Sequence, residues 1–155
     1  MHKFLSALLL VLVANTVFAA DSLTASQRIA AQGMQVQSER LKVISQNIAN
    51  SNTTGLTAED KPYKRKVIIF KNEYDPQIGS STVKVDKITH DKSEFIKKYE
   101  PYHPASDEGG YVKYPNVNIP LETVDAKEAQ RSYEANLSAL EIAKSNQARI
   151  IDAMR

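Results

Sequence analysis

The sequence contains no cysteine among its 155 residues. Disulfide bonds, thiolate nucleophiles and cysteine-ligated zinc sites are therefore excluded. The absence identifies no compartment, because an exported protein without cysteine simply has no thiol to protect.

The sequence also has no large excess of positive or negative charge, with 20 lysines and arginines against 18 aspartates and glutamates. The formal net charge is +2, and charged residues make up 25% of the chain. A nucleic-acid-binding face needs clustered basic residues, and basic residues concentrate only in Lys61–Lys66 and Lys97–Lys98. We expect solvated surface at both runs and no nucleic-acid partner. The length suits one domain with a modest core.

Motifs for enzymatic chemistry are absent as well. The sequence has no His-Glu-x-x-His, P-loop, Gly-x-Ser-x-Gly or Gly-x-Gly-x-x-Gly motif. The three histidines, His2, His90 and His103, lack metal-ligand spacing. Asp107 and Glu108 precede Gly109-Gly110, which favours a turn between strands over a catalytic carboxylate pair. We expect no catalytic residue, metal, cofactor or small-molecule substrate.

Proline is missing from both flanks of the chain. Its six positions are Pro62, Pro76, Pro101, Pro104, Pro115 and Pro120. Because proline disrupts helix interiors, the pattern permits two long helices and forbids a continuous one. The predicted fold class is α+β, in which long N- and C-terminal helices pair as a coiled coil around a small β-rich central insert. The predicted parts are a signal peptide (1–19), an N-terminal helix with its terminating turn (20–55), the insert (56–117) and a C-terminal helix (118–155).

The N-terminal flank carries two apolar stripes at helical spacing. One consists of Ala30, Met34, Leu41, Ile44 and Ile48, and the other of Ile29, Val36 and Val43. The stripes lie on nearly opposite sides, so the helix needs partners on both. We expect it to run from about Ser22 to Asn50 and to stop in the Asn/Thr/Gly cluster that ends at Gly55.

The C-terminal flank carries one broken apolar seam. It consists of Tyr133, Leu137, Leu140, Ile151 and Met154, with Lys144 and Gln147 at polar positions in it. Asp125 followed by Glu128 could cap the helix, or it could begin as early as Asn118.

The middle of the chain predicts short strands at Val67–Phe70 and Val83–Asp86, and a weaker one at Phe95–Tyr99. Six of the seven tyrosines fall here, namely Tyr63, Tyr74, Tyr99, Tyr102, Tyr111 and Tyr114. We expect these rings to pack a small sheet without a large aliphatic core.

The first nineteen residues predict a cleavable secretory signal. Lys3 precedes the apolar run Phe4–Ala14, and Val17-Phe18-Ala19 offers a cleavage site after Ala19. The run is too short for a stable span, which needs about 20 residues. The alternative is an uncleaved anchor. The destination predicted in either case is outside the cytoplasm.

Three segments carry a family resemblance. Leu41–Asn50, followed by Thr53-Thr54-Gly55, resembles an N-terminal signature in which a helix ends in Asn-x-x-Asn before a Thr/Gly turn. Gly110–Asn118 contains Gly-Tyr-Val-x-x-Pro-Asn-Val, and Ala129–Asn136 contains Arg-x-Tyr-x-Ala-Asn. In this order the three are similar to the rod and hook proteins of the bacterial flagellum.

The resemblance implies a proximal rod subunit in the periplasm. Its terminal helices would form a coiled coil with those of neighbours in a helical tube that carries torque. The implied partners are other rod proteins, copies of the chain and the basal-body rings. Gln37, Lys144 and Gln147 would set the register between subunits. Asn47 and Asn50 would satisfy backbone groups at the helix end, and Tyr133 would pack on the first helix.

The residues that we expect at subunit contacts or in structural motifs are Met34, Leu41, Ile44, Asn47, Ile48, Asn50, Gly55, Tyr111, Pro115, Asn116, Arg131, Tyr133, Asn136, Leu137 and Leu140.

Two other functions compete with this one. The first is a secreted binding module or adhesin that presents the tyrosine-rich insert on a helical stalk. The second is a periplasmic hydrolase, which the missing motifs disfavour. The export route also stays open, because the family is exported through the flagellar apparatus without a cleaved leader.

Overall fold

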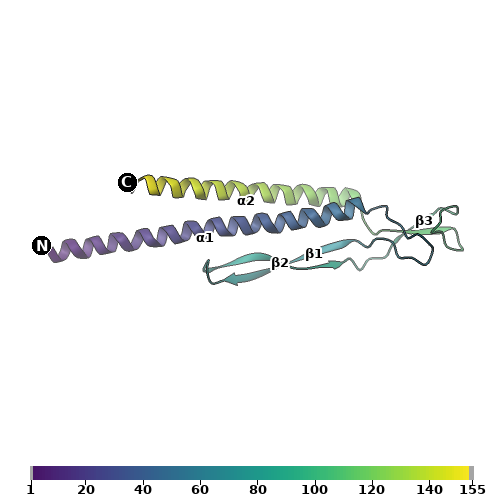
Figure 1. The fold of residues 1–155 in the computed structure, drawn as a ribbon, viewed down its shortest axis with the longest axis horizontal. Helices are drawn as coiled ribbons and strands as arrows, with labels where there is room; N and C mark the ends of the chain where they lie inside the picture. The colour runs from purple at the N-terminus through teal and green to yellow at the C-terminus, as the bar shows by residue number, and fades with distance from the viewer. Residues whose placement is uncertain (1, 154–155) are drawn as a thin grey trace.

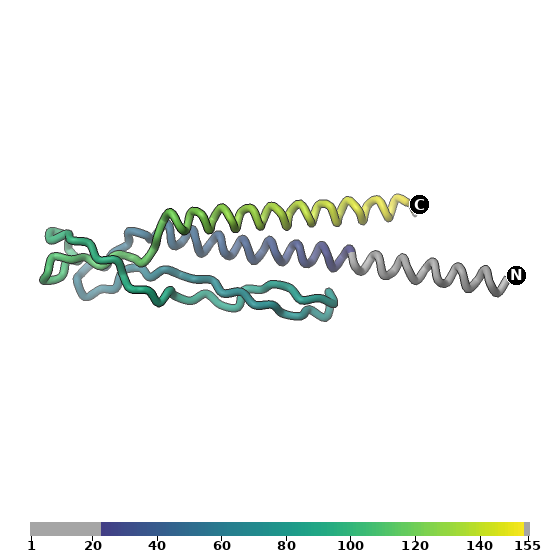
Figure 2. Tube along the Cα trace, turned by 180° about the vertical axis from the view of Figure 1, so that it is seen from behind, coloured from purple at the N-terminus to yellow at the C-terminus, as the bar shows by residue number. Residues whose placement is uncertain are grey.

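The computed structural model describes the backbone of residues 2–153 and the side chains of residues 23–153. Its elements are α1 (His2–Ala49), β1 (Lys66–Asp75), β2 (Ser80–His90), β3 (Ile96–Tyr99), β4 (Tyr111–Tyr114) and α2 (Ile119–Ala153). The molecule is elongated (Figure 1), with α1 and α2 antiparallel and both termini at one end. The β1–β2 hairpin runs along α1, and β3 lies at the end opposite the termini (Figures 1 and 2).

Helix α1 ends one residue before the predicted stop. The Asn50 side chain donates at 2.8 Å to the Gln46 carbonyl, which also accepts from the Asn50 backbone N–H. The same side chain accepts from the Thr53 hydroxyl at 3.3 Å, so it ties the last turn of the helix to the turn that follows. The helix begins at His2, earlier than the predicted Ser22. The predicted signal peptide lies outside the residues whose side chains are described and stays a prediction. Within the described side chains, no helical segment is long and apolar enough to cross a bilayer.

Helix α2 begins at the earlier of the two predicted positions. The Leu121 backbone N–H donates to the Asn118 side-chain oxygen at 3.1 Å, so Asn118 is the N-cap. Pro120 falls in the first turn, where its missing N–H breaks no helical hydrogen bond. Asp125 lies inside the helix and is not its cap.

The two helices pack closely along their shared length. Ala30 of α1 and Ala129 and Ala143 of α2 are buried. At Gly33 an added Cβ would lie 2.7 Å from the Asn136 side chain, so glycine permits the close approach there.

Gln147 makes a hydrogen bond inside this chain, and its predicted role between subunits stays a prediction. Its side-chain oxygen accepts a hydrogen bond of 2.7 Å from Gln27, which links the two helices of one molecule. Lys144, the other polar seam residue on α2, is exposed.

The second stripe of α1 has a partner inside the molecule. Val36 shares a hollow with Val83 and Val85 of β2, and Val43 shares another with Val67 of β1. Val36 and Val43 are both buried. The expected partner for Val36 and Val43 is therefore the β1–β2 hairpin of the same chain, while Ile29, the third member of the stripe, stays 39% accessible.

The insert forms two separate two-stranded sheets. β1 and β2 pair antiparallel with a bulge between Ile69 and Phe70, and β3 pairs antiparallel with β4. Gly79 and Gly110 have φ values of 68° and 82°, which suit glycine in the turns before β2 and β4. The Gly109-Gly110 turn between strands is confirmed.

The tyrosines mostly do not pack as we predicted. Tyr74, Tyr99, Tyr102 and Tyr111 are exposed, and Tyr102 is 99% accessible. A two-stranded sheet has no second layer to cover its outer face, so Tyr74, Tyr99 and Tyr111 remain in solvent, and Tyr102 lies in the loop between β3 and β4.

Candidate functional site

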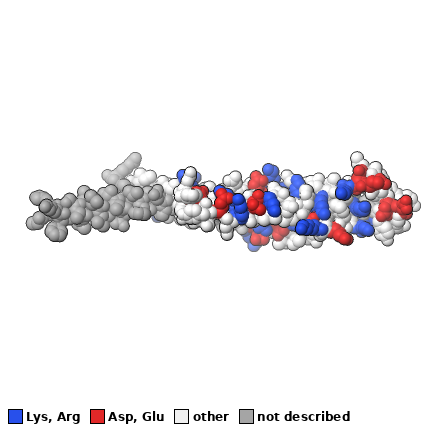
Figure 3. Space-filling model, turned by 90° about the horizontal axis from the view of Figure 1, so that it is seen from below, with Lys and Arg blue, Asp and Glu red and all other residues white. Residues whose placement is uncertain are grey.

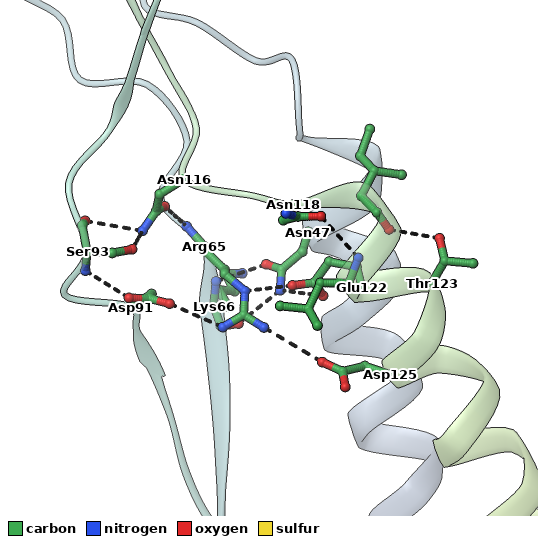
Figure 4. Close-up of polar contacts among 12 residues, drawn as sticks. Asn47, Arg65, Lys66, Asp91, Ser93, Asn116, Asn118, Glu122, Thr123 and Asp125 are labelled. Atoms are coloured by element: carbon green, nitrogen blue, oxygen red, sulfur yellow. Dashed lines mark hydrogen bonds and ion pairs between the residues drawn. The ribbon is translucent and has the colours of Figure 1, made fainter.

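A buried ionic junction joins the end of α1, the start of β1 and the first turn of α2 (Figure 4). Its centre is Glu122, which is fully buried at 0% exposure. The Arg65 Nε donates to Glu122 Oε1 at 2.6 Å, and the Asn47 Nδ2 donates to Oε2 at 3.2 Å. Both carboxylate oxygens are therefore paired, as a buried charge requires.

The side-chain amide of Asn47 connects α1 to β1 by pairing with both backbone groups of Lys66, as the backbone of a neighbouring strand would. Its Nδ2 donates to the Lys66 carbonyl, and its Oδ1 accepts from the Lys66 N–H, both at 2.9 Å. The Tyr63 hydroxyl also donates to Oδ1 at 2.9 Å. Because Asn47 is 1% exposed, it fixes the exit from α1 and offers nothing to a neighbouring subunit.

Arg65 extends the junction to the segment that follows β2. Its Nη1 lies 3.2 Å from Asp91 Oδ2, and its Nη2 lies 3.9 Å from Asp125 Oδ2. Its backbone N–H donates to the Asn116 side-chain oxygen at 2.8 Å, and Asn116 in turn donates to the Ser93 hydroxyl at 2.7 Å. Arg65 thus ties the start of α2 to the segments that follow β2 and β4, and Asn47 ties α1 to the same junction.

The charges in the junction hold each other ionised. Partial burial alone would lower the pKa of Arg65, but hydrogen bonding and attraction to Glu122 and Asp91 raise it. Hydrogen bonds from Ser93, and then the Arg65 charge, hold the pKa of Asp91 below its ordinary value. Burial and then the negative charge of Glu122 raise the pKa of Tyr63. Each pKa shift favours the protonation state that the hydrogen bonds and ion pairs need: neutral Tyr63, charged Arg65 and charged Asp91. The junction therefore has the properties of a structural contact.

Metal chemistry finds no support in the described side chains, which contain no group of three or more His, Asp or Glu suited to an ion. His90 is exposed. The His103 Nδ1 accepts from the Ala105 N–H at 3.0 Å and so belongs to a local turn.

The predicted motif residues fall into three groups. Those buried inside the chain, where they serve as structural positions, are Ile44, Asn47 and Pro115. Those that are partly covered are Met34, Leu41, Ile48, Asn50, Gly55, Asn116, Tyr133, Asn136 and Leu140. Those that are exposed are Tyr111, Arg131 and Leu137.

The sequence analysis missed the two charged residues at the centre of the junction. Arg65 was placed in a basic run assigned to solvent, and Glu122 carried no local signal. Their contact spans 57 positions of sequence, so only the fold brings them together.

The outer side of α2, turned away from α1, forms a second candidate site, because it keeps apolar side chains in solvent. Val124 and Ile142 are each 62% accessible and lie on the same side of the helix, with Arg131 and Ser138 between them. Among the described elements α2 contacts α1 alone, so none of these elements covers this side. Apolar side chains on an uncovered side of a helix make it a candidate surface for packing with another protein.

Substituting Glu122 with alanine should strongly destabilise the fold. The change leaves Arg65 and Asn47 without their buried acceptor, and we expect a loss of about 3 kcal/mol in the free energy of unfolding. Glu128→Ala is the matched control, since Glu128 pairs with Arg40 at 3.3 Å but is exposed, and it should cost less than about 0.5 kcal/mol. Chemical denaturation measures both, and equal losses would contradict a structural role for this buried junction.

Acid should weaken the Asp91 arm of the junction. The folded-state pKa of Asp91 lies below its ordinary 3.8, so its contribution is present above that pH and is lost as pH falls through the lower folded value. Asp91→Asn should therefore be less stable than the wild type at about pH 6, and the gap should narrow towards about pH 2. Thermal unfolding followed by circular dichroism measures this gap, and a constant gap would rule out the assigned role.

The sequence is similar to those of known proteins. The profile of the family described as "Flagella basal body rod protein" matches residues 28–57, and that of "Flagellar basal body rod FlgEFG protein C-terminal" matches residues 108–153. The flagellar basal-body rod protein FlgC of Agrobacterium fabrum is 43% identical over 87% of this chain and 97% of its own length. FlgC of Borreliella burgdorferi is 40% identical over 79% of this chain and 91% of its own length. FlgC of Salmonella typhimurium is 36% identical over 76% of this chain and 87% of its own length. The chain therefore belongs to the FlgC family of flagellar basal-body rod proteins.

Proposed function

We propose that this chain is a structural subunit of the flagellar basal-body rod. The observation that carries the proposal is the similarity to FlgC proteins along nearly their whole length, 97% in one case. The relatives reported above are named as rod proteins, which favours a mechanical role over a catalytic one.

The rod packs through its helices in this proposal. The outer side of α2 supplies exposed Val124 and Ile142, which neighbouring copies or other rod proteins would bury. Burying apolar side chains is favourable by roughly 25 cal/mol per Å² removed from water. A coiled coil between subunits would extend the pairing that α1 and α2 already make within one molecule.

The junction gives this subunit the stiffness that torque transmission requires. Arg65 and Glu122 fix the hairpins to both helices, so a load on one element passes to the others without a hinge at the helix ends. Buried, fully paired polar networks of this kind hold elements in one arrangement.

We place the rod subunit in the periplasm, in contact with other rod proteins and the basal-body rings. Removal of a secretory leader at Ala19 is part of this proposal. It is supported by Lys3, the apolar run Phe4–Ala14 and the cleavage-site pattern Val17-Phe18-Ala19 in the sequence. Mass analysis of the exported protein tests the point, and an intact Met1 would contradict it.

Charged substitutions on the outer side of α2 should block rod assembly without unfolding the monomer. Val124→Asp with Ile142→Asp should change the stability of the purified chain by less than about 1 kcal/mol, because both side chains are exposed. The same variant should abolish swimming and leave no complete basal bodies, because a carboxylate cannot be buried in an apolar contact.

The control is Ala148→Asp, which lies six residues beyond Ile142 and about 240° further round the helix. Ala148 is exposed, and we expect this variant to swim. Normal motility of the Val124→Asp/Ile142→Asp cells would contradict packing through this side of α2.

A further inference from the structure

The β3–β4 hairpin has one face that combines lysines with aromatic rings. In the antiparallel register Lys97 lies opposite Lys113, and Tyr99 lies opposite Tyr111. Cross-strand partners point to the same side of a sheet, so the four side chains share a face. The two tyrosine rings meet edge to face with centroids 5.4 Å apart, and both are exposed.

An open hollow of about 370 Å³ adjoins this face. Four lysines line it, namely Lys64, Lys92, Lys97 and Lys113, hereafter the lysine cluster. Phe95 provides an apolar wall, and the Lys64 ammonium lies 5.4 Å from the centre of its ring. Glu94 is the one carboxylate in the lining, so the hollow is strongly cationic.

The lysine cluster is not neutralised within the molecule. Among residues 23–153 none of its members forms an ion pair, whereas Lys71 and Lys84 of the other hairpin both pair with Glu73, at 2.8 and 2.7 Å. Like charges directly opposite each other weaken an antiparallel pair. The Lys97–Lys113 pair therefore works against its own hairpin, and an anionic group bound between them would relieve the repulsion.

We propose that this face docks an acidic segment of a partner protein. Carboxylates of the partner would lie against the lysine cluster, and its apolar side chains would cover Phe95, Tyr99 and Tyr111. On each strand the lysine and the tyrosine are two residues apart, or about 6.6 Å. Side chains on one face of an extended segment have the same spacing, so a segment with acidic and apolar residues in turn along that face fits the lysine and tyrosine pairs.

The charge distribution favours a protein over a membrane or nucleic acid. Those larger polyanions attract broad basic surfaces, but the net charge here is +2, and acidic and basic groups are intermixed over the face in Figure 3. The docking face also lies on the hairpin at the end of the molecule opposite the termini (Figure 1). It therefore adds a contact beyond the helix packing of the proposed function.

The variant Lys113→Glu should weaken binding of an acidic segment without destabilising the fold. A carboxylate at this position would face Lys97 and replace a repulsion with an attraction, so the melting temperature should stay level or rise. The matched control is Lys87→Glu, which makes the same charge change at an exposed position of β2.

The binding probe is a fluorescein-labelled peptide of glutamate, leucine and glycine, compared with the same peptide carrying glutamine for glutamate. Fluorescence anisotropy on the purified full chain at low salt should show Kd about tenfold weaker for Lys113→Glu, unchanged Kd for Lys87→Glu, and little binding of the glutamine peptide. Added salt should weaken the wild-type complex.

Three results would overturn the proposal: equal binding by all three proteins, no binding of the acidic peptide, or tighter binding to anionic phospholipid vesicles or inorganic phosphate than to the peptide. The peptide-binding assay needs no rod assembly, so a negative result there does not contradict the proposed rod function. Likewise, if the α2 variants show that the rod does not pack through α2, the peptide-binding assay still tests the docking face.

Discussion

The ion pair between Glu122 and Arg65 is the constraint from which the arrangement of the molecule follows. A carboxylate at 0% exposure is tolerated only when its oxygens are paired. Its partners come from the end of α1 and the start of β1, so these two segments and the first turn of α2 must meet at one point. Asn47 then binds the backbone of Lys66, which directs β1 back along α1. Helix pairing and hairpin placement thus share one origin.

This arrangement leaves the two helices in different situations. α1 is covered by α2 on one side and by the β1–β2 hairpin on another, which leaves Ala30, Val36 and Val43 buried and Ile29 39% accessible. α2 contacts α1 alone among the described elements, and its outer side keeps Val124 and Ile142 in solvent. The subunit therefore has a folded body and one helix side that no described element covers, and in the proposed rod that side receives the neighbours.

Local signals in the sequence predicted the parts of the fold that depend on local chemistry. Asn50 and Gly55 marked the end of α1, and Gly109-Gly110 marked a turn, because helix ends and tight turns are determined by a few neighbouring residues. The strands were predicted too short, since β1 and β2 continue through polar residues that cross-strand pairing holds in place.

Long-range features could not be predicted in the same way. The apolar stripe of Val36 and Val43 indicated a partner but not which one, and the hairpin of the same chain proved to be the answer. No local sequence pattern predicts the Arg65–Glu122 pair, because its members are 57 residues apart. The motif residues came from a family resemblance, and the structure adds that Ile44, Asn47 and Pro115 are buried in the monomer.

Solvent access at Val124 tests most directly whether neighbours cover α2 in the rod. Because the chain has no cysteine, Val124→Cys introduces a single labelling site, and Lys87→Cys on the β1–β2 hairpin provides a reference. Maleimide labelling should be fast at both positions in the free protein, and in isolated basal bodies it should be blocked at position 124. Equally fast labelling of Val124→Cys in free protein and in intact basal bodies would contradict the account.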